Sequence, residues 1–172
     1  GHTWMEFDTR PPALLTAIAL SPRYADDHTL LVGSYDSGVW SSTDGGDTFE
    51  VKNTTLPRAS AYDIQFTASS DGTLVSSMAL RDKVIGGTAP FDEWSQLGNN
   101  TIGYPTRLRV SPNWADDGVA LLGMRTPGIF RTSDFGATWV SVTPQLPPIS
   151  DIAFDEDARV VLTGHVSGRL GR

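Results

Sequence analysis

Short apolar runs, each bounded by glycine, proline, aspartate or serine, recur along the whole chain of 172 residues. In its first part these runs predict four strands, at residues 15–20, 29–33, 38–42 and 48–52. A turn at residues 22–27 and a tighter one at 44–47 separate them. No segment keeps apolar residues at helical spacing, so almost no helix is expected. The pattern therefore predicts an all-β protein.

The same arrangement returns at a fixed interval. The aromatic residues Trp4, Phe49, Trp94 and Trp139 stand 45 residues apart, and residues 19–33 are closely copied at 109–123. Four short antiparallel strands in about 45 residues are the size of one β-propeller blade. We therefore expect a single propeller domain, or a propeller segment, of about four four-stranded blades. The predicted repeats are residues 5–49, 50–94, 95–139, and 140–172 completed by 1–4.

The turn between the third and fourth strands carries the sharpest motif, Ser/Thr-x-Asp-x-Gly-x-Thr-aromatic. Its two well-formed copies consist of Ser42, Asp44, Gly46, Thr48 and Phe49, and of Thr132, Asp134, Gly136, Thr138 and Trp139. The aspartate is expected to accept backbone N–H groups across the turn, and the hydroxyl to add a further bond. Glycine supplies a positive φ. The aromatic ring is then expected to pack between neighbouring sheets.

This motif resembles the Asp box, or bacterial neuraminidase repeat, of propellers such as sialidases, xyloglucanase-type glycosidases, sortilin-like receptors and photosystem II assembly factors. The resemblance implies a β-propeller fold and a structural, non-catalytic role for the box residues. The unit that ends at Trp94 lacks the aspartate and glycine of the motif, so a turn of different shape is expected there. Either specialisation or drift in a tolerant turn explains that loss.

The two ends of the chain look like parts of one blade. Gly1–Trp4 matches the end of a box, and residues 167–172 align with the third strand at 37–42. Three arrangements remain open. The chain closes on itself as a four-bladed ring, two chains exchange end strands in an eight-bladed ring, or the chain is a segment of a larger propeller whose other blades are absent.

Charge and composition exclude several classes of function. The formal net charge is −7 with only two lysines, so no basic patch for nucleic acid or an anionic membrane is visible. There is no cysteine, which excludes disulfides and cysteine-based zinc sites. The longest apolar run, near 13–20, is too short to span a bilayer. His2, His28 and His165 show no metal spacing, and neither metal nor cofactor is expected.

Candidate chemistry is sparse. The acidic pairs Asp26-Asp27 and Asp116-Asp117 suggest glycosidase carboxylates or a calcium site, but their recurrence in matching turns favours turn chemistry. Tyr24 and Trp114 occupy equivalent places and form either an exposed platform for a sugar or a staple on their own blade. No sialidase-like arginine and tyrosine set can be assembled.

We therefore expect a non-catalytic scaffold, bacterial and extracellular or in the cell envelope. It would bind a protein or a carbohydrate, self-associate, or join the missing blades of a longer chain. The alternative is part of a sialidase- or xyloglucanase-type propeller.

Overall fold

The first sheet of the computed structural model follows the predicted strands closely. It contains β1 (Leu15–Leu20), β2 (Leu30–Ser34), β3 (Val39–Ser42) and β4 (Glu50–Val51) in sequential antiparallel order. The structure describes residues 3, 6, 9, 11–56, 60–98, 103–126, 128–143, 147–155 and 161–171. Trp4 and His2 lie outside the described residues.

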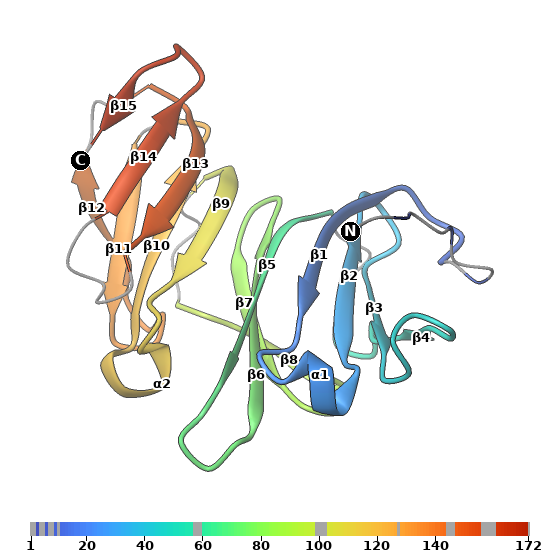
Figure 1. Ribbon diagram of the computed structural model, residues 1–172. Helices are drawn as coiled ribbons and strands as arrows, with labels where there is room; N and C mark the ends of the chain where they lie inside the picture. Colours follow the sequence, from blue (N-terminus) through green and yellow to red (C-terminus); the bar gives the residue numbers. More distant parts are fainter. Residues whose placement is uncertain are drawn as a thin grey trace.

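Three further sheets repeat this order (Figure 1). The second contains β5 (Ala61–Ala68), β6 (Leu74–Leu80), β7 (Val84–Thr88) and β8 (Trp94–Gln96). The third contains β9 (Pro105–Val110), β10 (Val119–Met124), β11 (Ile129–Ser133) and β12 (Val140–Thr143). The fourth contains β13 (Ile149–Phe154), β14 (Val161–His165) and β15 (Leu170–Gly171). We call the four sheets blades 1 to 4.

Two short helices interrupt this all-β pattern. Helix α1 (Tyr24–Asp27) joins β1 to β2, and α2 (Trp114–Asp117) joins β9 to β10. A turn was expected at both places, and in each the structure forms a single helical turn. Each helix ends at a residue with positive φ, His28 at 50° and Gly118 at 58°. Four residues are too few to show helical periodicity in the sequence.

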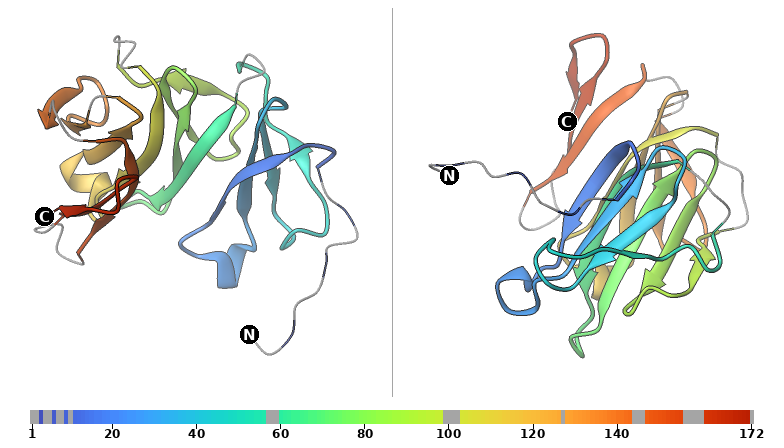
Figure 2. Two further views of the ribbon diagram at one scale, coloured as in Figure 1. Left: turned by 90° about the horizontal axis from the view of Figure 1, so that it is seen from above. Right: turned by 90° about the vertical axis from the view of Figure 1, so that its right-hand side faces the viewer.

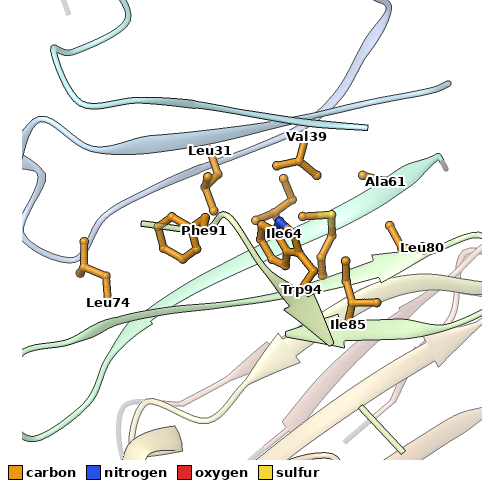
Figure 3. Packing of buried hydrophobic residues seen from close by; sticks show 10 residues of the cluster. Leu31, Val39, Ala61, Ile64, Leu74, Leu80, Ile85, Phe91 and Trp94 are labelled. Atoms are coloured by element: carbon orange, nitrogen blue, oxygen red, sulfur yellow. The ribbon is translucent and has the colours of Figure 1, made fainter. Parts of the chain in front are cut away.

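The hydrophobic core lies between blades rather than within them. One cluster joins Leu31 and Val39 of blade 1 to Ile64 and Trp94 of blade 2 (Figure 3). A second cluster joins blades 2 and 3, and a third joins blades 3 and 4. Each sheet is thus stabilised by its neighbours, as expected for stacked repeats.

Neighbouring blades meet through their innermost strands. Strand β1 contacts β5, β5 contacts β9, and β9 contacts β13. Figures 1 and 2 place blades 1 and 4 at opposite ends of this array. The predicted propeller fold of about four blades is confirmed. The described part of blade 4 has three strands, and the strand expected to complete it falls on residues 1–4, of which only Thr3 is described.

No helix among the described residues is long and apolar enough to cross a membrane.

Candidate functional site

The two motif turns form the same hydrogen-bond network. In blade 1 the Ser42 hydroxyl donates to Asp44 Oδ1 at 2.7 Å and accepts from the Gly46 N–H at 2.9 Å. Both the backbone N–H and the hydroxyl of Thr48 donate to Asp44, at 2.9 and 2.5 Å. These bonds, that of the Thr48 hydroxyl first, hold the pKa of Asp44 well below its usual range.

Blade 3 repeats this network bond for bond. Thr132 donates to Asp134 at 2.7 Å and accepts from Gly136 at 2.9 Å. Thr138 donates its N–H and hydroxyl to Asp134 at 2.8 and 2.6 Å, and the pKa of Asp134 is lowered for the same reason. All donors belong to the turn itself, so these residues shape the chain and leave little acceptor capacity for a ligand.

The three aromatic anchors that the structure describes have different surroundings. Trp94 is buried and donates its Nε1–H to the Lys52 carbonyl of blade 1 at 3.0 Å. Trp139 is buried in the cluster between blades 2 and 3. Phe49, by contrast, is half-buried at the outer face of blade 1, where no described blade covers it. Two of the rings therefore pack between sheets as the sequence predicts.

The turn before Trp94 has the different shape that was expected. Phe91 adopts a positive φ of 64° and donates its N–H to the Thr88 carbonyl at 2.8 Å. Its ring is buried, stacks on Trp94 at 5.8 Å and meets Phe66 edge-on at 5.3 Å. A buried ring thus replaces the polar network.

The recurring aspartates belong to the helical turns. Asp27 accepts from the Ser21 hydroxyl at 2.6 Å and from the Thr29 N–H at 2.9 Å. Burial raises the pKa of Asp27, but these hydrogen bonds outweigh it and leave the pKa lowered. Asp117 accepts from the Ser111 hydroxyl at 2.6 Å and the Val119 N–H at 2.8 Å.

Turn chemistry therefore accounts for Asp27 and Asp117. No cluster of three metal-ligating side chains occurs in the part of the chain that the structure describes. Another turn in which an aspartate accepts hydrogen bonds from its own turn joins β5 to β6. It was not identified from the sequence. There, hydrogen bonds from the Ser69 hydroxyl and the Thr73 N–H lower the pKa of Asp71 to about 2.

Tyr24 and Trp114 pack on their own blades. The Tyr24 hydroxyl donates to the Gly45 carbonyl at 3.2 Å, and Trp114 meets Phe135 edge-on at 5.6 Å. Each ring therefore ties a helical turn to the motif turn of its own blade, which is the staple arrangement. Neither residue offers the exposed platform that was the alternative.

The innermost strands carry a line of paired charges. Arg109 on β9 contacts Asp63 on β5 at 2.6 Å and Asp151 on β13 at 2.8 Å, so three blades are bridged. Arg107 lies 3.8 Å from Asp151. These carboxylates face guanidinium groups rather than each other, which stabilises the blade arrangement.

A hollow of about 580 Å³ opens near the start of the innermost strands, whereas the helical turns follow the end of β1 and of β9. Tyr35 and Arg125 donate their N–H groups to the carbonyls of Leu14 and Tyr104, which directly precede β1 and β9. Its lining includes Tyr35, Tyr62, Tyr104, Arg81 and Arg125. Tyr35, Arg81 and Arg125 each come directly after the second strand of blades 1, 2 and 3. We call these five residues the tyrosine–arginine mouth.

The two arginines of the mouth differ from those on the inner strands. Arg81 and Arg125 are exposed, and no ion pair involving either is found among the described residues. Tyr35 and Tyr104 are also largely exposed. Sequence reasoning missed this site because its residues come from five separate loops and strand ends. The only signal was the shared position of Tyr35, Arg81 and Arg125 in successive repeats.

Comparisons with solved structures agree with this fold. A GH74 enzyme from Niastella koreensis superposes with a TM-score of 0.66 at 16% identity, covering 87% of this chain and 25% of the enzyme. YCF48 from Cyanidioschyzon merolae gives a TM-score of 0.65 at 15% identity, with 91% and 52% covered. The extracellular domain of a one-component system from B. thetaiotaomicron gives 0.67 at 11% identity, with 98% and 23% covered.

At these identities the likeness shows the fold alone. This chain spans about half of the YCF48 structure and about a quarter of the other two. No family model and no curated protein matches the sequence.

Proposed function

We propose that this chain is a non-catalytic β-propeller scaffold of the Asp-box type that binds an acidic oligosaccharide at the tyrosine–arginine mouth. The observation that carries the proposal is the pair of exposed guanidinium groups, Arg81 and Arg125, in one hollow with three tyrosine rings. Binding hollows combine aromatic walls with a few polar groups that fix the ligand.

The chemistry of the mouth defines the ligand. Guanidinium groups remain charged at all ordinary pH values and bind carboxylates through two parallel hydrogen bonds. Tyrosine rings offer a flat apolar face for a sugar ring and a hydroxyl for its polar edge. A sugar that carries a carboxylate, such as a uronic acid, satisfies both groups. The chain as a whole has a net charge of −7, so two arginines without an ion-pair partner among the described residues form a local positive site in an otherwise acidic protein.

The absence of catalysis is part of the proposal. A glycosidase needs two acidic residues placed on either side of the scissile bond. Here Asp27 and Asp117 accept hydrogen bonds from their own turns, and Asp63 and Asp151 are both held by Arg109. These engagements support a binding role over a hydrolytic one. We place the protein outside the cell or in the envelope, where such glycans occur.

Calorimetric titration with an oligogalacturonate tests the binding. The wild-type chain should bind it and should bind a neutral oligosaccharide of the same length far more weakly. A hydrogen bond to a charged group contributes about 1.5–3 kcal/mol. Arg81→Gln and Arg125→Gln should therefore each weaken binding roughly tenfold or more. Arg131→Gln removes an equal charge from an exposed position on the third strand of blade 3 and should leave the affinity unchanged.

Three outcomes would overturn the proposal. The first is no binding by the wild-type chain, and the second is an equal loss in the Arg131 variant. A higher affinity for polyglutamate would assign the mouth to an acidic protein segment instead.

The GH74 likeness favours one alternative, that the chain is part of a glycosidase-like propeller. Hydrolysis of xyloglucan or of a sialoside by this chain would establish that alternative and exclude the non-catalytic scaffold.

A further inference from the structure

The interface between successive blades uses one arrangement repeatedly. An aliphatic residue on the first strand of each following blade packs against the second strand of the blade before it. Ile64 of blade 2 lies against Gly33 of blade 1, and Ile152 of blade 4 lies against Gly123 of blade 3. A Cβ atom at Gly33 would lie 2.7 Å from the Ala61 Cβ and 3.1 Å from the Ile64 Cδ1. One at Gly123 would lie 2.7 Å from the Ile149 Cγ2 and 3.2 Å from the Ile152 Cδ1. The approaches of 2.7 Å leave room for glycine but not for a larger residue at the two positions.

Strand pairing shows which residue takes this place in each blade. In blades 2, 3 and 4 it is Ile64, Leu108 or Ile152. Each of these residues pairs with the second strand of its own blade, with Met78, Leu122 and Thr163 respectively. At the same register in blade 1 stands Ile18, which pairs with Val32. The exposed fraction is 1–2% for Ile64, Leu108 and Ile152 but 65% for Ile18. Blade 1 therefore carries the apolar residue of a blade interface, but no blade among the described residues buries it.

Blade 4 carries the other half of the same interface. Its Gly164 occupies the register of Gly33 and Gly123. The three atoms nearest to a Cβ built on it belong to Ser150 and Asp151 of its own blade. Leu162 is 54% exposed, whereas its counterparts Leu31 and Leu121 are 0% and 5% exposed.

A second leucine of blade 4 shows the same contrast. Leu170 pairs with Gly164 as Val39 pairs with Gly33 and Ile129 with Gly123. Its exposed fraction is 88%, against 0% for Val39 and 4% for Ile129. Two leucines of blade 4 thus face solvent at places where internal blades bury aliphatic side chains.

The receiving surface on blade 1 is hollowed. A depression of about 420 Å³ is lined there by a mainly apolar set of residues that includes Pro11, Leu15, Ile18, Leu20, Leu30 and Phe49. Phe49 lies at this surface at the place where Trp94 and Trp139 are buried by the preceding blade. We call the Ile18 side of blade 1 and the side of blade 4 with Gly164, Leu162 and Leu170 the two end faces. They carry the two halves of the interface that joins adjacent blades within this chain.

We propose that a second copy of this chain occupies both end faces. Blade 4 of one copy, with Gly164, Leu162 and Leu170, stacks on the Ile18 face of blade 1 of the other, and the reverse contact closes a two-fold ring. Within one chain the two faces lie at opposite ends of the array (Figures 1 and 2). Exposed apolar patches of this kind mark interaction sites, and the internal interfaces already show that such faces fit each other.

The effect of salt distinguishes a dimer held by apolar contact from one held by ion pairs. Each copy carries a formal charge of −7, so association must be held by apolar contact against a general repulsion. Added salt screens that repulsion. The dimer should therefore become tighter as the salt concentration rises, whereas one held by ion pairs would loosen.

The mass in solution, measured by light scattering over a concentration series, tests the proposal. The wild-type chain should have twice the 18.5 kDa of one chain. Ile18→Asp and Leu162→Asp should each give the single-chain mass with unchanged circular dichroism, because both side chains are exposed in one copy. Val140→Asp changes an equally exposed aliphatic residue on the outer strand of blade 3 and should leave the dimer intact.

Mixing the two variants gives the sharpest result. The Ile18 variant keeps an intact blade 4 face and the Leu162 variant keeps an intact blade 1 face, so an equimolar mixture should recover pairs that neither variant forms alone. A monomeric wild-type chain would overturn the proposal and assign the end faces to blades of another polypeptide. An Ile18 variant that stays dimeric, or a mixture that stays monomeric, would equally overturn it.

These outcomes are separate from ligand binding, because Tyr35, Tyr62, Tyr104, Arg81 and Arg125 all belong to blades 1 to 3 of one copy. A monomeric Ile18 variant should still bind the oligogalacturonate.

Discussion

The chain joins the third strand of a blade to the fourth in two different ways. In blades 1 and 3 a hydroxyl, an aspartate and a threonine fill the turn with hydrogen bonds, and the aspartate remains at the surface. In blade 2 the same connection contains Phe91, whose ring lies against Trp94 (Figure 3). The Phe91 ring also meets Phe66 edge-on. In blades 2 and 3 this connection is followed by a tryptophan, Trp94 or Trp139, that packs in the interface with the preceding blade.

The difference shows that the position of the fourth strand can be fixed by either local polar bonds or tertiary packing. The polar turn needs only residues within the turn and is therefore readable in the sequence. The Phe91 turn depends on a partner on β5, 25 residues away, and on the blade 1 core. The two kinds of turn should consequently respond differently to mutation and to acid.

The largest effect is expected from Phe91→Ala. Removal of a fully buried phenylalanine destabilises a protein by about 3–5 kcal/mol because apolar burial is lost and a cavity remains. The midpoint of urea unfolding measures this loss. Phe135→Ala is the matched control, since Phe135 also has a positive φ, 58°, in the turn of blade 3 but is half exposed. Equal losses in the two variants would contradict the packing role of Phe91.

A smaller loss is expected from Thr132→Val in the polar turn. The substitution keeps the shape of the side chain but leaves the buried Gly136 N–H without its acceptor. An unsatisfied buried group costs about 1–3 kcal/mol, so the free energy of unfolding should fall by that amount. The exposed neighbour Ser133→Ala should change it little. A neutral result for Thr132→Val would show that packing, not the hydroxyl, holds this turn.

Acid should separate the two kinds of turn further. The folded-state pKa values of Asp44 and Asp134 are lowered, chiefly by the threonine hydroxyls. A carboxyl whose pKa is lowered by folding stabilises the folded state at pH values above its unfolded-state pKa of about 3.9. That stability is lost as the pH falls toward the folded-state pKa. The protection of the Thr48 and Thr138 amides, measured against their intrinsic exchange rates, should therefore fall below about pH 4.

Phe91 provides the internal control for this experiment. Its N–H donates to the Thr88 carbonyl, which does not titrate. Exchange at Phe91 should keep its ordinary dependence on pH through the same range. If all three amides lost protection together, the acid effect would be global unfolding rather than the titration of two turns.

Much of the fold was predictable because its causes are local. Strand β1 was predicted at its observed bounds, and the blade repeat followed from aromatic spacing, since both depend on residues close in the sequence. The tyrosine–arginine mouth was not predictable, because Tyr62 and Tyr104 join Arg81 and Arg125 only after the blades have stacked. The same holds for the exposure of Ile18. Its register identifies it as an interface residue, but only the stacked structure shows that its side chain is 65% exposed and that no described blade packs on it.

The smallest effect is expected at the exposed end of the polar turn, from Thr138→Val. This change removes the hydroxyl that donates to Asp134 but keeps the N–H bond to the same carboxylate. This hydrogen bond is exposed, so the loss in the free energy of unfolding should be smaller than that of Thr132→Val. Thr138→Ser keeps the donor and should retain wild-type stability. Because the hydroxyl is the main cause of the lowered Asp134 pKa, the valine variant should also raise that pKa, as carboxyl-carbon NMR measures. A pKa that stays unchanged in the valine variant would show that the backbone N–H groups alone hold the carboxylate, and the threonine of the motif would then serve only the shape of the turn.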